Sequence, residues 1–393
     1  MTIAVGAHRT GYANLPLHWG KAPPWLFQRM VKLARGMTLA IVEDQGPEAM
    51  LGRLSEPAWF QAFGCVLGFD WHSSGVTTTV CGAMKEGLHG LEQDTGLYVA
   101  GGKGGTSRKT PTEITQAGEA LGEDLSSLVY ASRMSAKVDS SAVQDGYQVY
   151  HHSFFFTAKG NWAVVQQGMN EDNGYARRYH WLGSRVASFV EEPHAAVCCD
   201  ARDATLNLVA QESAQARRAI AYLATEEHPD HVLADVQRLK TLTLPHRHYV
   251  AVEDIRPEHL ARTLAATYDR QPVGFEGVLA MPGVGAKTLR ALSLVAELVY
   301  GMPASVRDPA LYSFAHGGKD GYPYPVDRET YDGTIAYLGE ALRRAKVGES
   351  DRLDALRRLE AFWRDEKRPR QGSQKGSAGE RTAESDRVSG EGV

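Results

Sequence analysis

The sequence predicts an α+β fold that is predominantly helical. Two observations indicate it: apolar residues recur at helical spacing over most of the chain, whereas one central block has a period of two. We therefore expect four segments. These are a helical N-terminal region with a glycine-rich loop over 1–110, a central α/β region with a β-hairpin or small antiparallel sheet over 111–200, a helical region with a helix-hairpin-helix over 201–366, and a disordered tail over 367–393.

Helices account for the N-terminal part of this prediction. Pro23 and Pro24 stand where a first helical turn tolerates proline, directly before the apolar-rich run WLFQRMVKLARGM. After this run, segments rich in small and apolar residues are separated by short turn sequences. This pattern is typical of several packed helices joined by tight turns. Further helices are predicted over 48–54, over 58–88 with a turn at 72–75, and over 112–130.

The central block carries the strand pattern. Residues 146–157 (GYQVYHHSFFFT) and 161–168 (NWAVVQQG) are rich in aromatic and β-branched residues. Between them, Ala158-Lys159-Gly160 is a hairpin signal, and 177–189 is a candidate continuation of the sheet. Helical spacing then returns, and helices are predicted over 206–239 with a break at His228-Pro229, over 260–268, over 275–300 and over 328–363.

Composition excludes several classes of protein. The chain has 393 residues, 43% of them hydrophobic, which is enough to bury sizeable cores. The net charge of −4 (43 basic minus 47 acidic residues) shows that binding of nucleic acid would depend on local geometry, not on bulk charge. No apolar stretch is long enough to cross a membrane, so we expect a cytoplasmic protein with no membrane partner. The cysteines lack any C-x-x-C spacing, which predicts buried reduced thiols at Cys65, Cys81, Cys198 and Cys199.

The strongest local motif lies at residues 275–301, FEGVLAMPGVGAKTLRALSLVAELVYG. It resembles the helix-hairpin-helix of DNA-repair and recombination proteins. Glycines allow the backbone to approach a phosphate, and the unpaired N–H groups of the second helix, with its dipole, form an anion site. Such contacts position duplex or branched DNA without reading its sequence. The predicted contact residues are Gly283, Val284, Gly285, Lys287, Thr288 and Arg290.

The residues after this motif raise an alternative. Helix-hairpin-helix glycosylases carry a similar hairpin lysine, then a helix, a Gly-x-Pro turn and an aspartate. Lys287, Gly301-Met302-Pro303 and Asp308 occur here in that order. By this resemblance, Lys287 is a candidate Schiff-base nucleophile of a DNA glycosylase/AP lyase, and Asp308 is its acidic partner. The connecting helix is about one turn longer here, and the usual Val-Asp-x-His is replaced by Arg307-Asp308-Pro309.

Other segments carry a resemblance over most of the chain. They include LPLHWGKAPPWLFQRMVKLA, WFQAFGCVLGFDWHSSGVTTTVCGAMKEGL, AKVDSSAVQDGYQVYHHSFFF, WAVVQQGMN and HGGKDGYPYPVDRETYD. Together they resemble the domain of unknown function 763 family of prokaryotes, over roughly residues 11–359. The resemblance implies membership of a family and, through the hairpin alone, a role in DNA processing.

Candidate catalytic residues concentrate in the central block. A metal-dependent nuclease holds Mg²⁺ or Mn²⁺ with carboxylates, sometimes with histidine, and activates water. Asp139, Asp145 and His152 are the predicted ligands of this divalent metal, and His151 and Lys137 are predicted to assist catalysis. Because neighbours on a strand face opposite sides, only one of His151 and His152 can point into a given site. A polar hairpin that shapes a groove without catalysis is the alternative.

Two glycine-rich basic loops are candidate phosphate contacts. The first spans residues 100–110 and carries Lys103, Arg108 and Lys109, and the second, at 316–321, carries Lys319. The first loop is not a Walker A motif. The cluster Asp70-Trp71-His72-Ser73-Ser74 predicts a helix cap or a nucleotide contact more than a catalytic triad, because triad partners usually come from separate elements.

Three hypotheses about function remain open. The protein is a structure-dependent DNA nuclease with a divalent metal, a glycosylase/lyase, or a noncatalytic DNA-binding scaffold of a repair complex. A homo-oligomer or a repair protein is the expected partner besides DNA.

Overall fold

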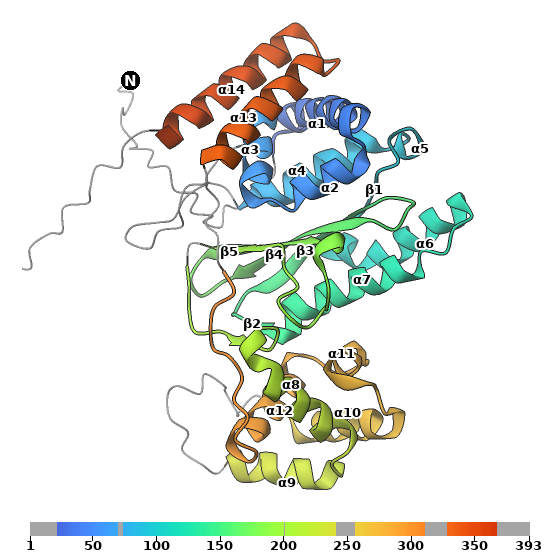
Figure 1. Cartoon of the computed structure of the whole chain (residues 1–393), viewed down its shortest axis with the longest axis vertical. Coiled ribbons are helices and arrows are strands. Elements are labelled where there is room, and N and C mark those ends of the chain that lie inside the picture. The colour runs from blue at the N-terminus through green and yellow to red at the C-terminus, as the bar shows by residue number, and fades with distance from the viewer. Residues whose placement is uncertain (1–21, 70–73, 200, 241–255, 311–327, 368–393) are drawn as a thin grey trace, which may run out of the picture.

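The computed structural model describes residues 22–69, 74–199, 201–240, 256–310 and 328–367. Helices, a five-stranded antiparallel sheet and a separate two-stranded pair build this part of the chain, so the predicted fold class is confirmed (Figure 1). None of the described helices is long and apolar enough to span a membrane.

The N-terminal helices form a layer on one face of the sheet. Each of the first three begins at a proline, which is compatible with the free first turn of a helix. Gly68 ends the third in the left-handed region, at a φ of 105°. The elements are α1 (Pro24–Gln45), α2 (Pro47–Leu54), α3 (Pro57–Leu67), α4 (Gly75–Leu88) and the short α5 (Glu92–Thr95).

The last two helices return to this N-terminal layer. α13 (Arg328–Arg344) packs against α1, and α14 (Glu349–Lys367) packs against α3. Arg358 of α14 donates two hydrogen bonds to the carbonyl of Val66 at the end of α3, at 2.9 and 2.7 Å. The ends of the described chain therefore share one helical layer, although the sequence pattern groups α13 and α14 with the preceding helices (Figure 1).

The sheet has five antiparallel strands in the order β1-β3-β4-β5-β6. The predicted hairpin is confirmed as the β3–β4 pair, and the predicted continuation begins at Tyr175. The strands are β1 (Tyr98–Lys103), β3 (Gln148–Phe156), β4 (Trp162–Asn170), β5 (Tyr175–Leu182) and β6 (Ala196–Cys198); β2 (Val143–Gln144) and β7 (Leu206–Asn207) form a separate pair.

Alternation along the strands gives the sheet two apolar faces. Phe155 and Val165 join the core with the N-terminal helices, whereas Phe154 and Val164 join the core with α6 (Thr110–Leu121) and α7 (Ser126–Lys137). The single helix predicted over 112–130 is wrong. Two helices occupy the region, because α6 ends at Gly122, which adopts the left-handed conformation with a φ of 71°.

A helical unit follows the sheet and lies below it in Figure 1. Its helices pack mainly around α8 and α12, and they continue the core under α7. The helix predicted from residue 206 starts later, because 206–207 pair with β2 as a short strand. The helices are α8 (Ala214–Thr225), α9 (Pro229–Lys240), α10 (Pro257–Arg270), α11 (Gly274–Ala280) and α12 (Ala286–Leu298), and the short helical turns elsewhere are η1 (Gly104–Lys109), η2 (Val138–Ala142), η3 (Gly183–Arg185) and η4 (Gln211–Ser213).

The four cysteines are buried and form no disulfide, as the spacing predicted. Burial raises the pKa of the Cys81 thiol to about 12, because the apolar surroundings disfavour the thiolate. Cys199 also donates its thiol to the hydroxyl of Tyr147, at 3.2 Å.

Candidate functional site

The turn between α11 and α12 presents its backbone at two glycines. Gly283 has a φ of 85°, a conformation that L side chains rarely adopt. Gly285 precedes α12 and has open space around it, since an added Cβ would meet no atom within 4 Å. Val284 lies between them and is buried, so its side chain anchors the turn in the core. The turn therefore combines a fixed backbone with an accessible helix N-terminus.

The side chains of α12 divide between surface and interior. Lys287 is exposed beside the turn, whereas Thr288 is buried and faces the core. Arg290 donates its Nε–H to Gln144 Oε1 at 2.9 Å, and Gln144 Nε2 donates to the carbonyl of Ala286 at 2.9 Å. Arg290 thus helps to hold the turn against the β2 segment.

Lys137 has the same kind of structural contact. Its ammonium group donates to the carbonyl of Met281, at the start of the turn, at 2.6 Å. Partial burial lowers the pKa of Lys137, because desolvation disfavours the ammonium form. The residue predicted to stabilise charge at a metal site therefore attaches α7 to the turn between α11 and α12.

Asp139 lies in a single turn of π-helix, η2, at the end of α7. One carboxylate oxygen accepts N–H groups of Gln166, at 2.5 Å, and Trp181, at 3.0 Å. The other lies 2.5 Å from Nε2 of His194. Both carboxylate oxygens of Asp139 are therefore held by side chains from three other segments. π-Helical turns often occur at functional sites, where they redirect a side chain.

His194 completes an aspartate–histidine pair that the sequence did not predict. It lies in the segment between β5 and β6, and its ring packs edge-on against Trp181, with centroids 4.6 Å apart. With Nε2 bound to Asp139, Nδ1 is the nitrogen left for proton exchange. Two residues earlier, Glu192 has a positive φ of 42°, a strained conformation for a residue other than glycine. Only the fold could reveal this pair, because 54 intervening residues separate its members.

The two predicted histidines face opposite sides of the sheet, as strand alternation requires. His152 lies on the α7 side, where its ring nitrogens contact Ser132 Oγ at 2.9 Å and Gln166 Oε1 at 2.8 Å. Burial lowers the pKa of His152 to about 4. His151 lies on the side of the N-terminal helices, and burial, helped by His152 and Lys103, lowers its pKa to about 3. Both imidazoles are therefore neutral near pH 7.

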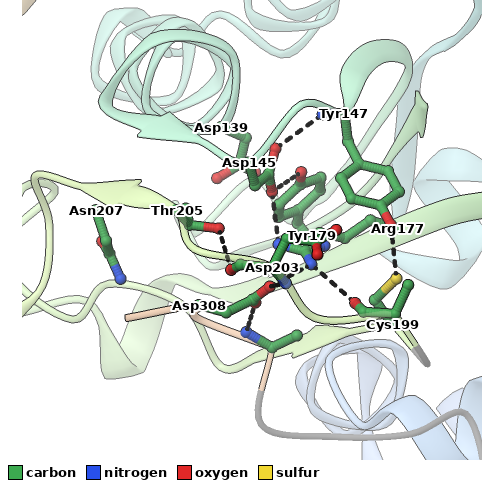
Figure 2. Close-up of polar contacts among 12 residues, drawn as sticks. Asp139, Asp145, Tyr147, Arg177, Tyr179, Cys199, Asp203, Thr205, Asn207 and Asp308 are labelled. Atoms are coloured by element: carbon green, nitrogen blue, oxygen red, sulfur yellow. Dashed lines mark hydrogen bonds and ion pairs between the residues drawn. The ribbon is translucent and has the colours of Figure 1, made fainter. Parts of the chain in front are cut away.

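Asp145 belongs to a different network, centred on Arg177 of β5 (Figure 2). The buried guanidinium donates to Asp145 at 2.9 Å and to Asp308 at 2.7 Å. Tyr179 donates to the same Asp145 oxygen at 2.6 Å. Burial opposes the charge of Arg177, but the nearby Asp145 carboxylate outweighs it and holds the pKa of Arg177 well above its usual value. This ion triad ties the segment that carries Asp308 to the sheet.

Asp308 is therefore engaged away from the hairpin lysine. Besides Arg177, its oxygens accept the backbone N–H groups of Asp203, at 3.1 Å, and Ala310, at 2.8 Å. These donors account for both carboxylate oxygens of Asp308. The described contacts thus give it a structural role beside β5, and they do not join it to Lys287.

The three predicted metal ligands do not form a metal site. Asp139 and His152 are bridged by Gln166, whereas Asp145 is paired with Arg177. Among the residues that the structure describes, no group of three His, Cys, Asp or Glu side chains is placed to hold a metal ion. The donor set therefore does not fit Mg²⁺ or Mn²⁺ as predicted, since these ions require several oxygen ligands around one point.

The first glycine-rich loop is only partly a loop: residues 100–103 form the end of β1 and pair with β3, and residues 104–109 form the surface turn η1. Lys103, Arg108 and Lys109 are exposed, and Lys103 Nζ lies 5.7 Å from the ring centre of Tyr150. Lys319 of the second loop and residues 70–73 of the Asp70–Ser74 cluster lie outside the described residues.

Fold and site together define an α+β protein with a five-stranded antiparallel sheet between helical layers, an exposed glycine turn, and a buried polar centre formed by Asp139, His152, Gln166 and Trp181. The chain belongs to the family described as "Protein of unknown function (DUF763)", whose family model matches residues 11–326. Neither the curated proteins nor the solved structures contain a match.

Proposed function

We propose that this protein binds the phosphate backbone of duplex or branched DNA through the turn between α11 and α12, as a helix-hairpin-helix does, in DNA repair or processing. The observation that carries the proposal is the open turn at Gly283 and Gly285, directly before α12. The N-terminal amides of a helix and its dipole attract phosphate, and an exposed lysine adds a point charge. Such binding is not sequence-specific.

The attachments of the turn support this proposal. Lys137 and Gln144 hold the carbonyls of Met281 and Ala286, so the backbone carbonyls point toward the protein. A turn fixed in this way pays little conformational entropy when it meets a phosphate. The overall charge of −4 is no obstacle, because the contact is local.

The first prediction tests this turn. We expect Gly285→Val to weaken binding of a labelled DNA duplex about tenfold, because the new side chain occupies the space through which a phosphate approaches. The variant folds normally, since an added Cβ has no neighbour within 4 Å and the backbone is extended there. Fluorescence anisotropy over a range of salt concentrations measures affinity and the number of phosphate contacts, and we expect Gly285→Val to flatten the salt dependence.

Gly333→Val is the matched control, because Gly333 is an exposed residue of α13 and also has open space around it. Equal affinity and equal salt slope for the two variants would contradict the assignment of this turn to DNA.

A second candidate function is cleavage of the phosphodiester bond, and the Asp139–His194 pair favours it. A buried carboxylate that orients an imidazole through one nitrogen leaves the other as a general base. Asp139 is fully buried and the His194 side chain is 8% exposed, so the pair lies at the edge of the buried polar centre. In the cleavage step, His194 would take a proton from water, the water oxygen would form a bond to phosphorus, the P–O bond to one strand oxygen would break, and the proton on His194 would pass to that departing oxygen.

The second prediction concerns this cleavage. We expect His194→Ala to lower the rate of strand cleavage at least about 100-fold, the usual contribution of a general base. The assay uses labelled single-stranded, duplex and branched DNA, with Mn²⁺ and with chelator in parallel. His228→Ala is the control, because that side chain is 55% exposed on the surface. If His194→Ala does not change the rate of cleavage, the Asp139–His194 pair is not the cleavage site. If the protein cleaves none of these DNAs, the noncatalytic DNA-binding scaffold is the remaining function.

A further inference from the structure

A row of polar side chains crosses the face of the sheet that packs against the N-terminal helices. Lys103 of β1 is paired with His151 of β3, which is paired with Gln167 of β4. Directly opposed residues of antiparallel strands point to the same face, so these three side chains are neighbours. An irregularity in the register between Val149 and His151 brings Tyr150 to the same face, where Gln167 Nε2 lies 2.5 Å from its hydroxyl. Such bulges redirect side chains next to functional sites.

Two atoms in this row are buried without a hydrogen-bond partner. They are Nδ1 of His151 and Oε1 of Gln167, on side chains that are 1% and 0% exposed. The remaining polar atoms of both residues are satisfied: His151 Nε2 contacts Ser153 Oγ at 3.0 Å, and Gln167 Nε2 donates to Tyr150 and to the carbonyl of Ser74. Buried polar groups in native proteins are nearly always paired, so two adjacent orphans indicate a missing ligand.

The row lies at the positive end of a long helix. Gln167 reaches the carbonyl of Ser74, the residue that precedes α4, at 2.8 Å. α4 has 14 residues, so its dipole favours an anion at this end. Gln167, which carries one of the two unpartnered atoms, therefore lies beside the N-terminus of α4.

Positively charged side chains lie on the segment at the exposed end of the row. Lys103 ends β1 and leads into η1, which carries Arg108 and Lys109. Among the ion pairs of the described residues, none involves these three cations. Lys103 therefore supplies positive charge at the exposed end of the row, whereas His151, Gln167 and Tyr150 supply neutral donors and acceptors. An anion that also carries a hydrogen-bond donor matches this arrangement.

We propose that this row is a nucleotide-binding site, separate from the turn between α11 and α12. The phosphate lies between Lys103, the hydroxyl of Tyr150 and the N-terminus of α4. A sugar hydroxyl beside the phosphate donates to Oε1 of Gln167, and Nδ1 of His151 makes the second contact. A free nucleotide and the phosphorylated end of a DNA strand share this chemistry.

The test measures binding of adenosine 5′-monophosphate to the full chain by isothermal titration calorimetry. Adenosine and inorganic phosphate are titrated separately. We expect the nucleotide to bind with one-to-one stoichiometry and more tightly than either fragment, and Lys103→Met to weaken it about tenfold by removing a charge-assisted contact. Lys159→Met is the control, because Lys159 is exposed at the turn of the same sheet, away from the row.

Two further arms make the result decisive. Gly285→Val separates this site from the DNA-binding turn, and we expect it to leave nucleotide binding unchanged. An oligonucleotide is also titrated with and without a 5′-phosphate. If the 5′-phosphate raises the affinity and Lys103→Met abolishes that increase, the ligand of the row is the phosphorylated end of a DNA strand. The proposal is overturned if adenosine 5′-monophosphate binds no more tightly than adenosine and the 5′-phosphate adds nothing to the affinity of the oligonucleotide. It is also overturned if Lys103→Met and Lys159→Met change the affinity equally.

Discussion

At the scale of single residues, burial decides what the polar side chains can do. His151 and His152 are sequence neighbours, yet one contacts Ser153 beside the N-terminal helices and the other contacts Ser132 of α7. Asp139 and Asp145 look alike in the sequence, but one holds a histidine and the other an arginine. For the histidines the role follows from the strand face, and for the aspartates it follows from the partners that the fold brings to each carboxylate.

The neutral state of His152 has a consequence for stability. Its pKa is lowered to about 4 in the folded chain by burial and is about 6.5 in the unfolded chain. Between these values the unfolded chain binds a proton that the folded chain does not. The free energy of unfolding therefore falls as the pH drops from 7 to 4, by at most about 1.4 kcal/mol per pH unit for this residue.

We expect His152→Gln to make this fall shallower in urea unfolding measured at several pH values. His89→Gln is the control, because the His89 side chain is 88% exposed. Parallel stability curves for wild type and His152→Gln would show that another group is responsible.

At the scale of elements, one segment serves both candidate sites for DNA. The end of α7 and the π-helical turn that follows carry Lys137, which holds the turn between α11 and α12, and Asp139, which holds His194. Gln144, a few residues later, holds the start of α12. The residues expected to line one metal site thus fix the relative positions of two sites, because the π-helical turn changes the direction in which successive side chains point.

At the scale of the whole molecule, the last two described helices pack against the first ones. α13 and α14 bury Leu338, Leu342 and Leu359 in the same core as α1 and α3. The net charge of −4 is distributed so that basic groups remain exposed at η1 and, as Lys287, in the first turn of α12. An acidic protein can in this way present local sites for phosphate.

The return of α14 is tested by Leu359→Ala. We expect a loss of about 2–5 kcal/mol in the free energy of unfolding, as for large-to-small changes in a packed core. Leu353→Ala, on the same helix and 43% exposed, is the control and should change stability little. Equal effects in denaturant unfolding would mean that α14 does not complete the N-terminal core.

The sequence by itself determined the fold class, the β3–β4 hairpin, the opposite faces of His151 and His152, and the family. These features follow from local periodicity and turn residues, which are written in consecutive positions. Only the tertiary structure decided that His194 meets Asp139, that Asp308 pairs with Arg177, and that Lys103, His151 and Gln167 form one row. These contacts join distant segments, and their register depends on how whole elements pack, which no local pattern specifies.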